Sequence, residues 1–303
     1  MALTQLKEMN FELLPTPMDQ SGVVFGIGRR VSLDGEGGFD PGEDEWTDED
    51  DTNPRTGGRV FGRETLNGPT WLFAGHTDEA DTKGALEAIS EIKTAWRASH
   101  LRDEPGAVTM LRYRKGGRTR RVYGRPRRFA APPDNRVLGG FVPITMEFAC
   151  ATGYTYSDEE KEVVLQMGAA ASSGGLVFPC VFPLTTLPPG DNVSSAYVDG
   201  DADAWPVVTF RGPLTNPVLK HENWTLSLTL SLTAPQEVTV DLRPWALTVR
   251  RENGQSVAGK LGRRQQLTEM RLHPGQNPLS FTASGLSGSG SCTVRWADTW
   301  NSI

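Results

Sequence analysis

The sequence contains little that would mark a membrane, secreted or disulfide-linked protein. No stretch of its 303 residues approaches the roughly 20 apolar residues that a membrane span needs. The N-terminal region carries Lys7, Glu8 and Glu12 among its apolar residues, so a signal peptide is not expected. Cysteine is scarce, and its odd number and wide spacing favour core thiols in a reducing compartment over a disulfide framework or a zinc knuckle. The three cysteines are Cys150, Cys180 and Cys292.

The sequence also lacks an excess of positive charge and the residue spacings of catalytic and metal-binding motifs. The 31 Lys and Arg residues are outnumbered by 37 Asp and Glu, and the net charge of -6 argues against a dedicated nucleic-acid-binding domain. The serine-containing loop 285–290 lacks the final glycine of a nucleophile elbow. The histidines stand singly, without metal-ligand spacing, at His76, His100, His221 and His273. We therefore expect no enzyme, no catalytic residue, no metal and no cofactor. Paired carboxylates of a glycoside hydrolase stay an alternative, because such pairing is spatial.

Glycine and proline, in contrast, recur along the whole chain. Their 33 and 21 copies indicate many short strands joined by turns. The length permits one large all-β unit or two domains. Residues 168–200 are rich in Gly, Ala, Ser and Pro, and we interpret them as the crossing between two domains. The prediction is a mainly β protein with domains at residues 1–165 and 166–303.

The first of these domains should contain a single α-helix. Leu86, Ile89, Ile92 and Trp96 recur at intervals of three and four residues, which predicts an apolar helical stripe. Asp81 or Thr82 can cap its start. Residues 108–113 and 119–123 flank Lys115-Gly116-Gly117 and predict a β-hairpin, because glycine supplies the positive φ of a tight turn. Further strands are expected over 11–14, 23–31, 70–74 and 141–150.

The second domain carries the strongest two-residue period in the sequence. From Trp224 to Leu232, apolar residues alternate with Ser and Thr, as a half-buried strand requires. A strand over 237–242 is expected to pair with this preceding one. Asn253-Gly254 predicts another hairpin turn. With strands expected over 279–282 and 292–296, the pattern is typical of an antiparallel sandwich.

Two segments concentrate charge. Ten carboxylates lie between Asp34 and Asp51 among glycines, which predicts a solvated loop; their spacing is not that of a calcium-binding loop. The predicted hairpin and the residues after it are basic. This hairpin could contact DNA phosphates, stay solvated, or meet the acidic surface of a neighbouring copy. Its basic residues are Arg112, Arg114, Lys115, Arg118, Arg120, Arg121, Arg125, Arg127 and Arg128.

The order of several short blocks resembles the siphophage distal tail proteins, especially those of phages infecting actinobacteria. The blocks are Trp71–Phe73, Met110–Tyr113, Val122–Arg128, Phe210–Pro213, Asn216–Pro217, Val238–Pro244, Leu272–Asn277 and Val294–Ile303. The resemblance implies an N-terminal β-barrel-like domain with one helix, forming a hexameric ring around the tail channel, and a C-terminal galectin-like sandwich. It also implies a structural protein of the virion, assembled in the host cytoplasm, that connects the tube of a long non-contractile tail to its tip.

A ring of identical copies uses a contact between two unlike patches. We predict that basic and aromatic residues form one patch, with the candidates Trp71, Phe73, Arg112, Arg118, Arg120, Arg121 and Arg125. Acidic residues on the lumen or surface would repel DNA phosphates in transit, with the candidates Asp44, Glu45, Asp48, Glu49 and Asp50. The expected partners are further copies, the tail tube protein, a tail-tip or tail-associated lysin-like protein and the tape measure protein; no membrane is expected.

A carbohydrate-binding module that contacts the host envelope is the main alternative. Tryptophans can stack on sugars, although at strand positions they are more often core residues. The candidates are Trp205, Trp224, Trp245, Trp296 and Trp300.

Overall fold

The computed structural model describes residues 4–16, 22–132, 134–166, 192–284 and 290–302. The predicted mainly β fold is confirmed, with 51% of residues in strands. The chain divides into two compact units, Met1–Asp158 with Trp300–Ile303 and Glu159–Thr299. The predicted boundary at residue 165 falls inside the strand Thr155–Gln166, and Cys180 and most of the predicted crossing lie outside the described residues.

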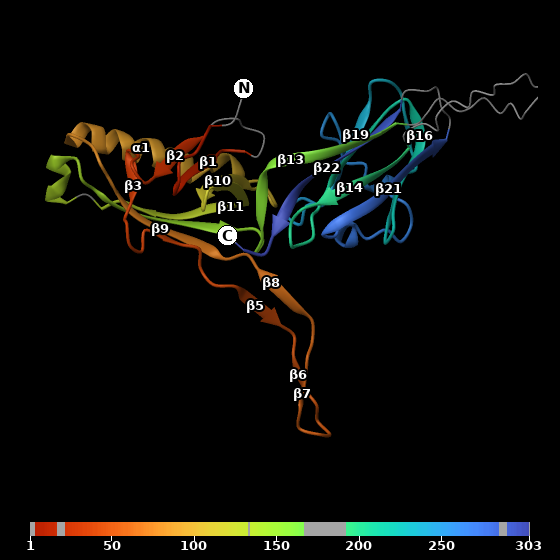
Figure 1. Cartoon of the computed structure of the whole chain (residues 1–303), viewed down its shortest axis with the longest axis horizontal. Helices are drawn as coiled ribbons and strands as arrows, with labels where there is room; N and C mark the ends of the chain where they lie inside the picture. The colour runs from red at the N-terminus through yellow and green to blue at the C-terminus, as the bar shows by residue number, and fades with distance from the viewer. Residues whose placement is uncertain (1–3, 17–21, 133, 167–191, 285–289, 303) are drawn as a thin grey trace, which may run out of the picture. The chain divides into compact units, whose positions relative to one another are not determined.

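The N-terminal unit is built on one antiparallel sheet with the order β2-β1-β10-β11-β12-β9, in which β3 and β4 pair with β9 and β13 pairs with β11 (Figure 1). Its strands are β1 (Asn10–Leu14), β2 (Val23–Gly26), β3 (Val31–Leu33), β4 (Phe39–Asp40), β9 (Thr70–Thr77), β10 (Thr109–Lys115), β11 (Arg118–Ala130), β12 (Pro143–Cys150) and β13 (Thr155–Gln166). The short helices η1 (Ser99–Leu101) and η2 (Asn135–Gly139) lie in its connections.

The predicted hairpin is confirmed as β10 and β11. Lys115 pairs with Arg118, so Gly116 and Gly117 form the turn. Their φ angles of 59° and 75° lie in the left-handed region, which glycine adopts without a steric penalty.

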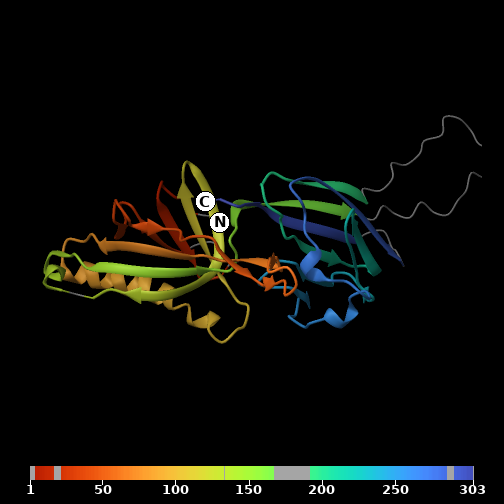
Figure 2. The same ribbon diagram turned by 90° about the horizontal axis from the view of Figure 1, so that it is seen from below.

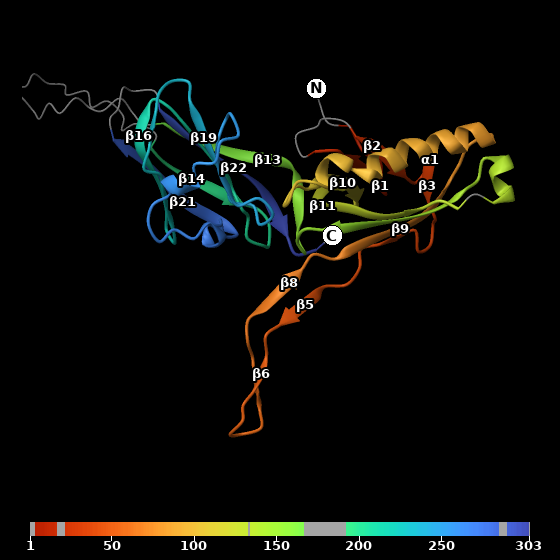
Figure 3. The ribbon, with the colours of Figure 1, turned by 180° about the vertical axis from the view of Figure 1, so that it is seen from behind.

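The predicted helix is α1 (Thr82–Arg97), the only α-helix among the described residues. Asp81 caps it, because its Oδ1 accepts a hydrogen bond from the Gly84 amide at 2.7 Å. The predicted stripe is correct for its second half and wrong at Leu86, whose side chain is 50% exposed. The buried face instead runs through two alanines and consists of Ala85, Ala88, Ile92 and Trp96. Figure 3 shows α1 lying along the strands of this unit.

The core of this unit is a cluster of aromatic rings between the helix and the strands. Phe73 and Phe25 meet edge to face, with centroids 5.3 Å apart, and Trp96 contacts Phe25 at 5.9 Å. The indole of Trp96 also donates to the Arg128 carbonyl at 3.1 Å. Such T-shaped pairs stabilise a core beyond the area they bury.

The predicted acidic loop is instead a two-stranded arm. Strands β5 (Glu45–Asp48) and β8 (Glu64–Asn67) pair, and beyond them β6 (Asp51–Thr52) pairs with β7 (Arg59–Val60). Figure 1 shows this arm running away from the other strands of the N-terminal unit, and Figure 2 views its orange strands from below. Strands β5, β6 and β7 lack a two-residue period because both of their faces are exposed to solvent. Strand β8 is exposed in its first half and half-buried at Leu66 and Asn67.

The C-terminal unit is the predicted antiparallel sandwich. One sheet has the order β22-β15-β19-β20, with β13 beside β22, and the other has the order β14-β21-β16-β17, with β18 on β16. The strands are β14 (Val193–Val198), β15 (Val207–Arg211), β16 (Leu214–His221), β17 (Thr225–Ser227), β18 (Ser231–Leu232), β19 (Glu237–Asp241), β20 (Thr248–Arg251), β21 (Gly275–Ser284) and β22 (Ser291–Trp300).

Two predictions for this unit need correction. The strand β19 pairs with β15 and β20, not with the alternating segment that precedes it, because the chain passes from one sheet to the other after β18. Asn253-Gly254 does form a turn, but the segment after it contains η3 (Ala258–Lys260) and later η4 (Leu267–Glu269), and only a single bridge joins Arg250 to Ser256.

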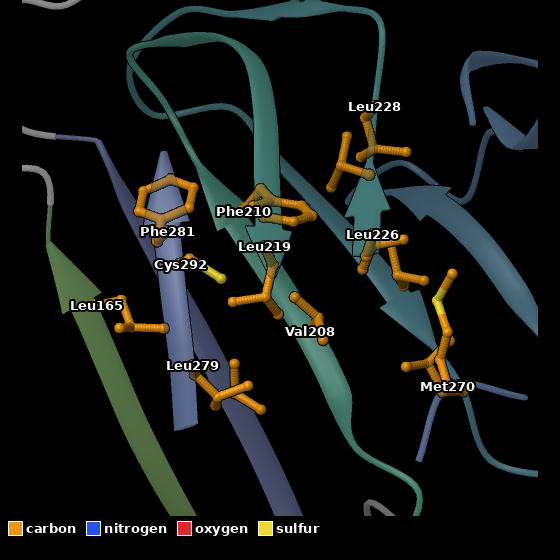
Figure 4. Packing of buried hydrophobic residues seen from close by; sticks show 14 of the residues in the cluster. Leu165, Val208, Phe210, Leu219, Leu226, Leu228, Met270, Leu279, Phe281 and Cys292 are labelled. Carbon is orange, nitrogen blue, oxygen red and sulfur yellow. The ribbon is translucent and has the colours of Figure 1, made fainter. Parts of the chain in front are cut away.

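The alternation of Leu with Ser and Thr has the predicted meaning. Leu219, Leu226, Leu279 and Phe281 point from three neighbouring strands into one core, where they meet residues of the other sheet such as Phe210 (Figure 4). Their polar neighbours in sequence therefore point to the opposite face of the sheet.

Candidate assembly surfaces

Arg112 on β10 is the most buried basic residue among the described residues, with 2% of its surface exposed. Its Nε and Nη2 donate to the two carboxylate oxygens of Asp158 at 2.7 and 2.6 Å, and its Nη1 donates to Glu12. Glu12 is fully buried and also accepts from the Gly22 amide at 3.1 Å. Burial alone lowers the pKa of Arg112, but Asp158 and Glu12 outweigh it and raise this pKa above its ordinary value. Arg112 thus ties β1, β10 and the start of β13 together.

Arg120 on β11 holds the last described residues of the chain. Its guanidinium lies 4.4 Å from the ring centroid of Trp300 and donates to the Ser302 carbonyl at 2.6 Å. The Thr155 hydroxyl donates to the same carbonyl at 2.7 Å. Trp300 and Ser302 therefore belong physically to the N-terminal unit.

The other predicted interface residues differ in exposure. Arg118 is exposed at the hairpin end, whereas Arg125 is half-buried and donates to the Ala107 carbonyl at 2.6 Å. Arg121 is 5% exposed and packs against Tyr123. Trp71 and Phe73 are buried in the core. The interface role of all seven residues stays a prediction, and Arg118 is the member that solvent reaches most freely.

The five predicted acidic residues all lie on or beside the arm. Asp44, Glu45, Asp48 and Glu49 are exposed, while Asp50 is half-buried, accepts from the Gly62 amide at 3.0 Å and pairs with Arg59. Asp48 stands directly opposite Glu64 across the two strands. Like charges in this position destabilise a strand pair, so the contact between Asp48 and Glu64 weakens the arm.

Sequence reasoning missed the apolar residues of the arm as surface residues. Trp46 is 57% exposed, Val60 is 51% exposed and Phe61 is 74% exposed. Val60-Phe61 follows a charged and glycine-rich stretch. An isolated apolar pair in such a stretch was the feature of the sequence that could have indicated exposed apolar residues. Large apolar side chains exposed on a projecting element are candidates for a contact with another protein.

The five tryptophans that were candidates for stacking on sugars also differ in exposure. Trp224 and Trp296 are 8% and 4% exposed and belong to the sandwich core. Trp205, Trp245 and Trp300 are half-buried. None of the five forms an exposed aromatic platform.

His221 is a buried histidine of the C-terminal unit. Its ring stacks on Trp224 with centroids 5.0 Å apart, its Nε2 lies 3.1 Å from Asn277 Oδ1, and its Nδ1 accepts from the Asn223 amide at 3.3 Å. This arrangement fits a neutral ring with the proton on Nε2. Burial lowers the pKa of His221, and the nearby His273 acts in the same direction.

The C-terminal unit should therefore lose stability on acidification. The unfolded state binds a proton at the ordinary histidine pKa of about 6.5, whereas the folded state resists it, so stability present above this pH falls as the pH drops through it. The loss is at most about 1.4 kcal/mol per pH unit for this residue. Urea titrations between pH 7.5 and 5.5 should show a steeper loss for the native chain than for His221→Gln. Equal pH slopes would contradict the assignment.

The described residues contain no group of three or more His, Cys, Asp or Glu side chains arranged to hold a metal ion. Within the same residues, no helix has the length and apolar character that crossing a membrane requires. Cys150 and Cys292 are both buried, and burial raises the pKa of each thiol.

Among the comparisons with known proteins, only the one with solved structures finds similar proteins, and the similarity is in fold. No family model matches the sequence, and no curated protein matches it. The fold is of the kind found in phage tail-hub and baseplate proteins, as the resemblance in sequence implies. One similar structure is the SPP1 Dit (gp 19.1) protein, described as a paradigm of the hub adsorption apparatus in phages infecting Gram-positive hosts. It is 14% identical with a TM-score of 0.50, covering 85% of this chain and 89% of that one.

The phage P2 baseplate supplies two further similar structures. In its activated conformation with Ca, one chain is 11% identical with a TM-score of 0.56, covering 94% of this chain and 97% of that one. The same baseplate with Sr gives the same values. These likenesses span nearly the whole chain, so they include both units.

Proposed function

We propose that this chain is a structural component of a long non-contractile phage tail, a distal tail protein that forms a ring, with six copies as the expected number, and connects the tail tube to the tip. The observation that carries the proposal is the likeness in fold, over 85–94% of the chain, to a phage hub protein and to baseplate chains. In this role the protein has no turnover, and its work is done by contacts with copies of itself and with other tail proteins.

The arm supplies a physical reason for assembly. A two-stranded hairpin is marginally stable by itself, and this one exposes Trp46, Val60 and Phe61 while it places Asp48 opposite Glu64. Covering these apolar side chains with a neighbouring copy would stabilise both the arm and the contact. The contact is between unlike surfaces, which is the type that closes a ring.

Charge can add specificity to this contact. The arm is rich in exposed carboxylates, and Arg118, Arg127 and Arg128 are exposed on the basic hairpin of the same unit. Attraction between such patches on neighbouring copies steers their association and weakens as salt rises. This version of the predicted interface uses the exposed arginines and leaves Arg112, Arg120 and Arg121 in their intramolecular contacts.

Negative-stain images and light scattering of the purified chain test the proposal. The expected result is a ring with a central hole and a mass six times 33.1 kDa. Trp46→Ser with Phe61→Ser should raise the concentration at which the ring dissociates by at least about tenfold, because each large apolar side chain contributes roughly 1.5–3 kcal/mol on burial.

The matched control is Leu138→Ser, which removes an apolar side chain that is 76% exposed on η2. It should leave the ring intact, and circular dichroism should show all variants folded. A native chain that stays monomeric with tail tube protein present would overturn the ring. A ring that tolerates the arm variants would overturn only the contact through the arm.

A further inference from the structure

The outer face of the sheet β14-β21-β16-β17 is exposed and rich in hydroxyl groups. Lys220 pairs with Ser280 on one side and with Thr225 on the other, so these three side chains form a row across three strands. Their sequence neighbours Leu219, Leu226 and Leu279 point into the core (Figure 4), which directs the row to the opposite, outer face. Thr282 and Ser195 lie on the same face by the same alternation and are exposed.

A dibasic turn is fixed at one edge of this face. The Gly262 amide donates to the Ser227 carbonyl at 2.9 Å, and the Gln265 side chain accepts from the Ser227 amide at 3.2 Å. Arg263 and Arg264 project between these two anchors, are exposed, and Arg264 adopts a φ of 63°. The turn is thus held on β17 at both ends.

Lys220 belongs to the same patch as the turn. Ser227 lies two residues beyond Thr225, the direct partner of Lys220, so Lys220 and Ser227 are diagonal neighbours at about 7–8 Å. In the part of the chain that the structure describes, Lys220, Arg263 and Arg264 have no carboxylate partner, whereas Arg271 and Arg243 are paired with Asp203 and Asp241. In a chain of net charge -6, this leaves a local cluster of free positive charge.

The chemistry of the face defines its ligand. Hydroxyl groups in a flat row hydrogen-bond to sugar hydroxyls, and exposed Lys and Arg bind acidic groups. Tyr197, 52% exposed on β14, adds a ring on which a sugar can stack. Among the described residues of this face, only Val193 and Tyr197 on β14 are exposed large apolar side chains, which is fewer than a protein partner would need. Its described residues also include no series of aromatic rings for stacking bases.

We propose that this outer face binds an anionic polysaccharide, with Lys220, Arg263 and Arg264 contacting its carboxylate or phosphate groups and the hydroxyl row contacting its sugars. This activity goes beyond a structural role in the tail and does not depend on ring formation. The binding is of moderate strength and weakens with salt, because its charged contacts are exposed.

The test uses the full chain with polygalacturonate, its fully methyl-esterified form and phosphorylated dextran. Calorimetry at low salt should detect binding to at least one acidic polymer, and the esterified polymer should bind at least about tenfold more weakly. Lys220→Ala with Arg263→Gln and Arg264→Asn should weaken binding by about tenfold or more. Asparagine is chosen at 264 because it tolerates the left-handed backbone.

Lys93→Ala with Arg97→Ala is the control, because it removes exposed charge from α1 and should leave binding unchanged. Ser280→Glu places a negative charge beside Lys220 and should also weaken binding by about tenfold or more. Tyr197→Ala should weaken binding to the polysaccharide. Absence of binding to both acidic polymers overturns the proposal. So does equal binding by the triple variant, or equal affinity for a DNA duplex, which would mean a general polyanion surface.

Discussion

Replacing Arg112 with alanine is expected to lower the free energy of unfolding of the N-terminal unit by about 3–5 kcal/mol. The substitution leaves the Glu12 carboxylate fully buried without its cation and removes both hydrogen bonds to Asp158. A buried charge without a partner bears the cost of leaving water with nothing to offset it, so this loss exceeds that of an ordinary surface ion pair. Denaturant titration followed by circular dichroism measures the change.

Arg118→Ala supplies the matched control, since it removes an exposed arginine from the same hairpin and should change stability by no more than about 0.5 kcal/mol. A second variant, Arg112→Met with Glu12→Leu, replaces the buried pair by apolar side chains and should recover part of the loss. If Arg112→Ala and Arg118→Ala had equal effects, Glu12 would not depend on its contact with Arg112.

The arginine hairpin shows where sequence reasoning stops. The turn at Gly116 and Gly117 was predictable, because both the residue types and their spacing are local. The burial of Arg112 was not, because its partners Glu12 and Asp158 lie 100 and 46 residues away along the chain. From sequence alone, a charged residue in a strand is predicted to be exposed, because its oppositely charged partners are known only once the fold is known.

The helix shows a smaller limit of the same kind. The three- and four-residue spacing predicted α1 and its cap, but it favoured Leu86 over Ala85 and Ala88 as core residues. Small residues let the helix approach the sheet closely, and a pattern weighted by side-chain size does not reveal this. The pairing of β19 with β15 and β20 was equally hidden, because strand partners are set by the whole sandwich.

The charged composition of the candidate surfaces was predictable from the sequence, but their strand pairing and the residues that share a face were not. The acidic segment was visible as charge, but its strands β5 and β6 are exposed on both faces, so their pairing leaves no amphipathic signal in the sequence. The basic turn at Arg263 and Arg264 becomes a candidate binding site only when the structure places it beside the exposed sheet face. Both surfaces depend on register, which places residues distant in sequence on one side of a strand.

The N-terminal unit should depend on Trp96 as strongly as on Arg112. Trp96→Ala is expected to lower the free energy of unfolding by about 3–5 kcal/mol, because the side chain is 1% exposed and its removal leaves a cavity. The substitution removes the contacts of the indole with Phe25, Phe73 and Phe148, and the Arg128 carbonyl loses its hydrogen bond.

Two further variants separate the contribution of core packing to the free energy of unfolding from those of the indole hydrogen bond and of helix propensity. Trp96→Phe keeps most of the ring and loses the indole donor, so its effect should lie between those of the native chain and Trp96→Ala. Leu86→Ala changes the half-exposed side of the same helix and should cost far less, since its leucine is 50% exposed. Equal losses for Trp96→Ala and Leu86→Ala would mean that α1 packs on the sheet through the face predicted from its spacing, and that the face containing Ala85 and Ala88 does not form the core contact.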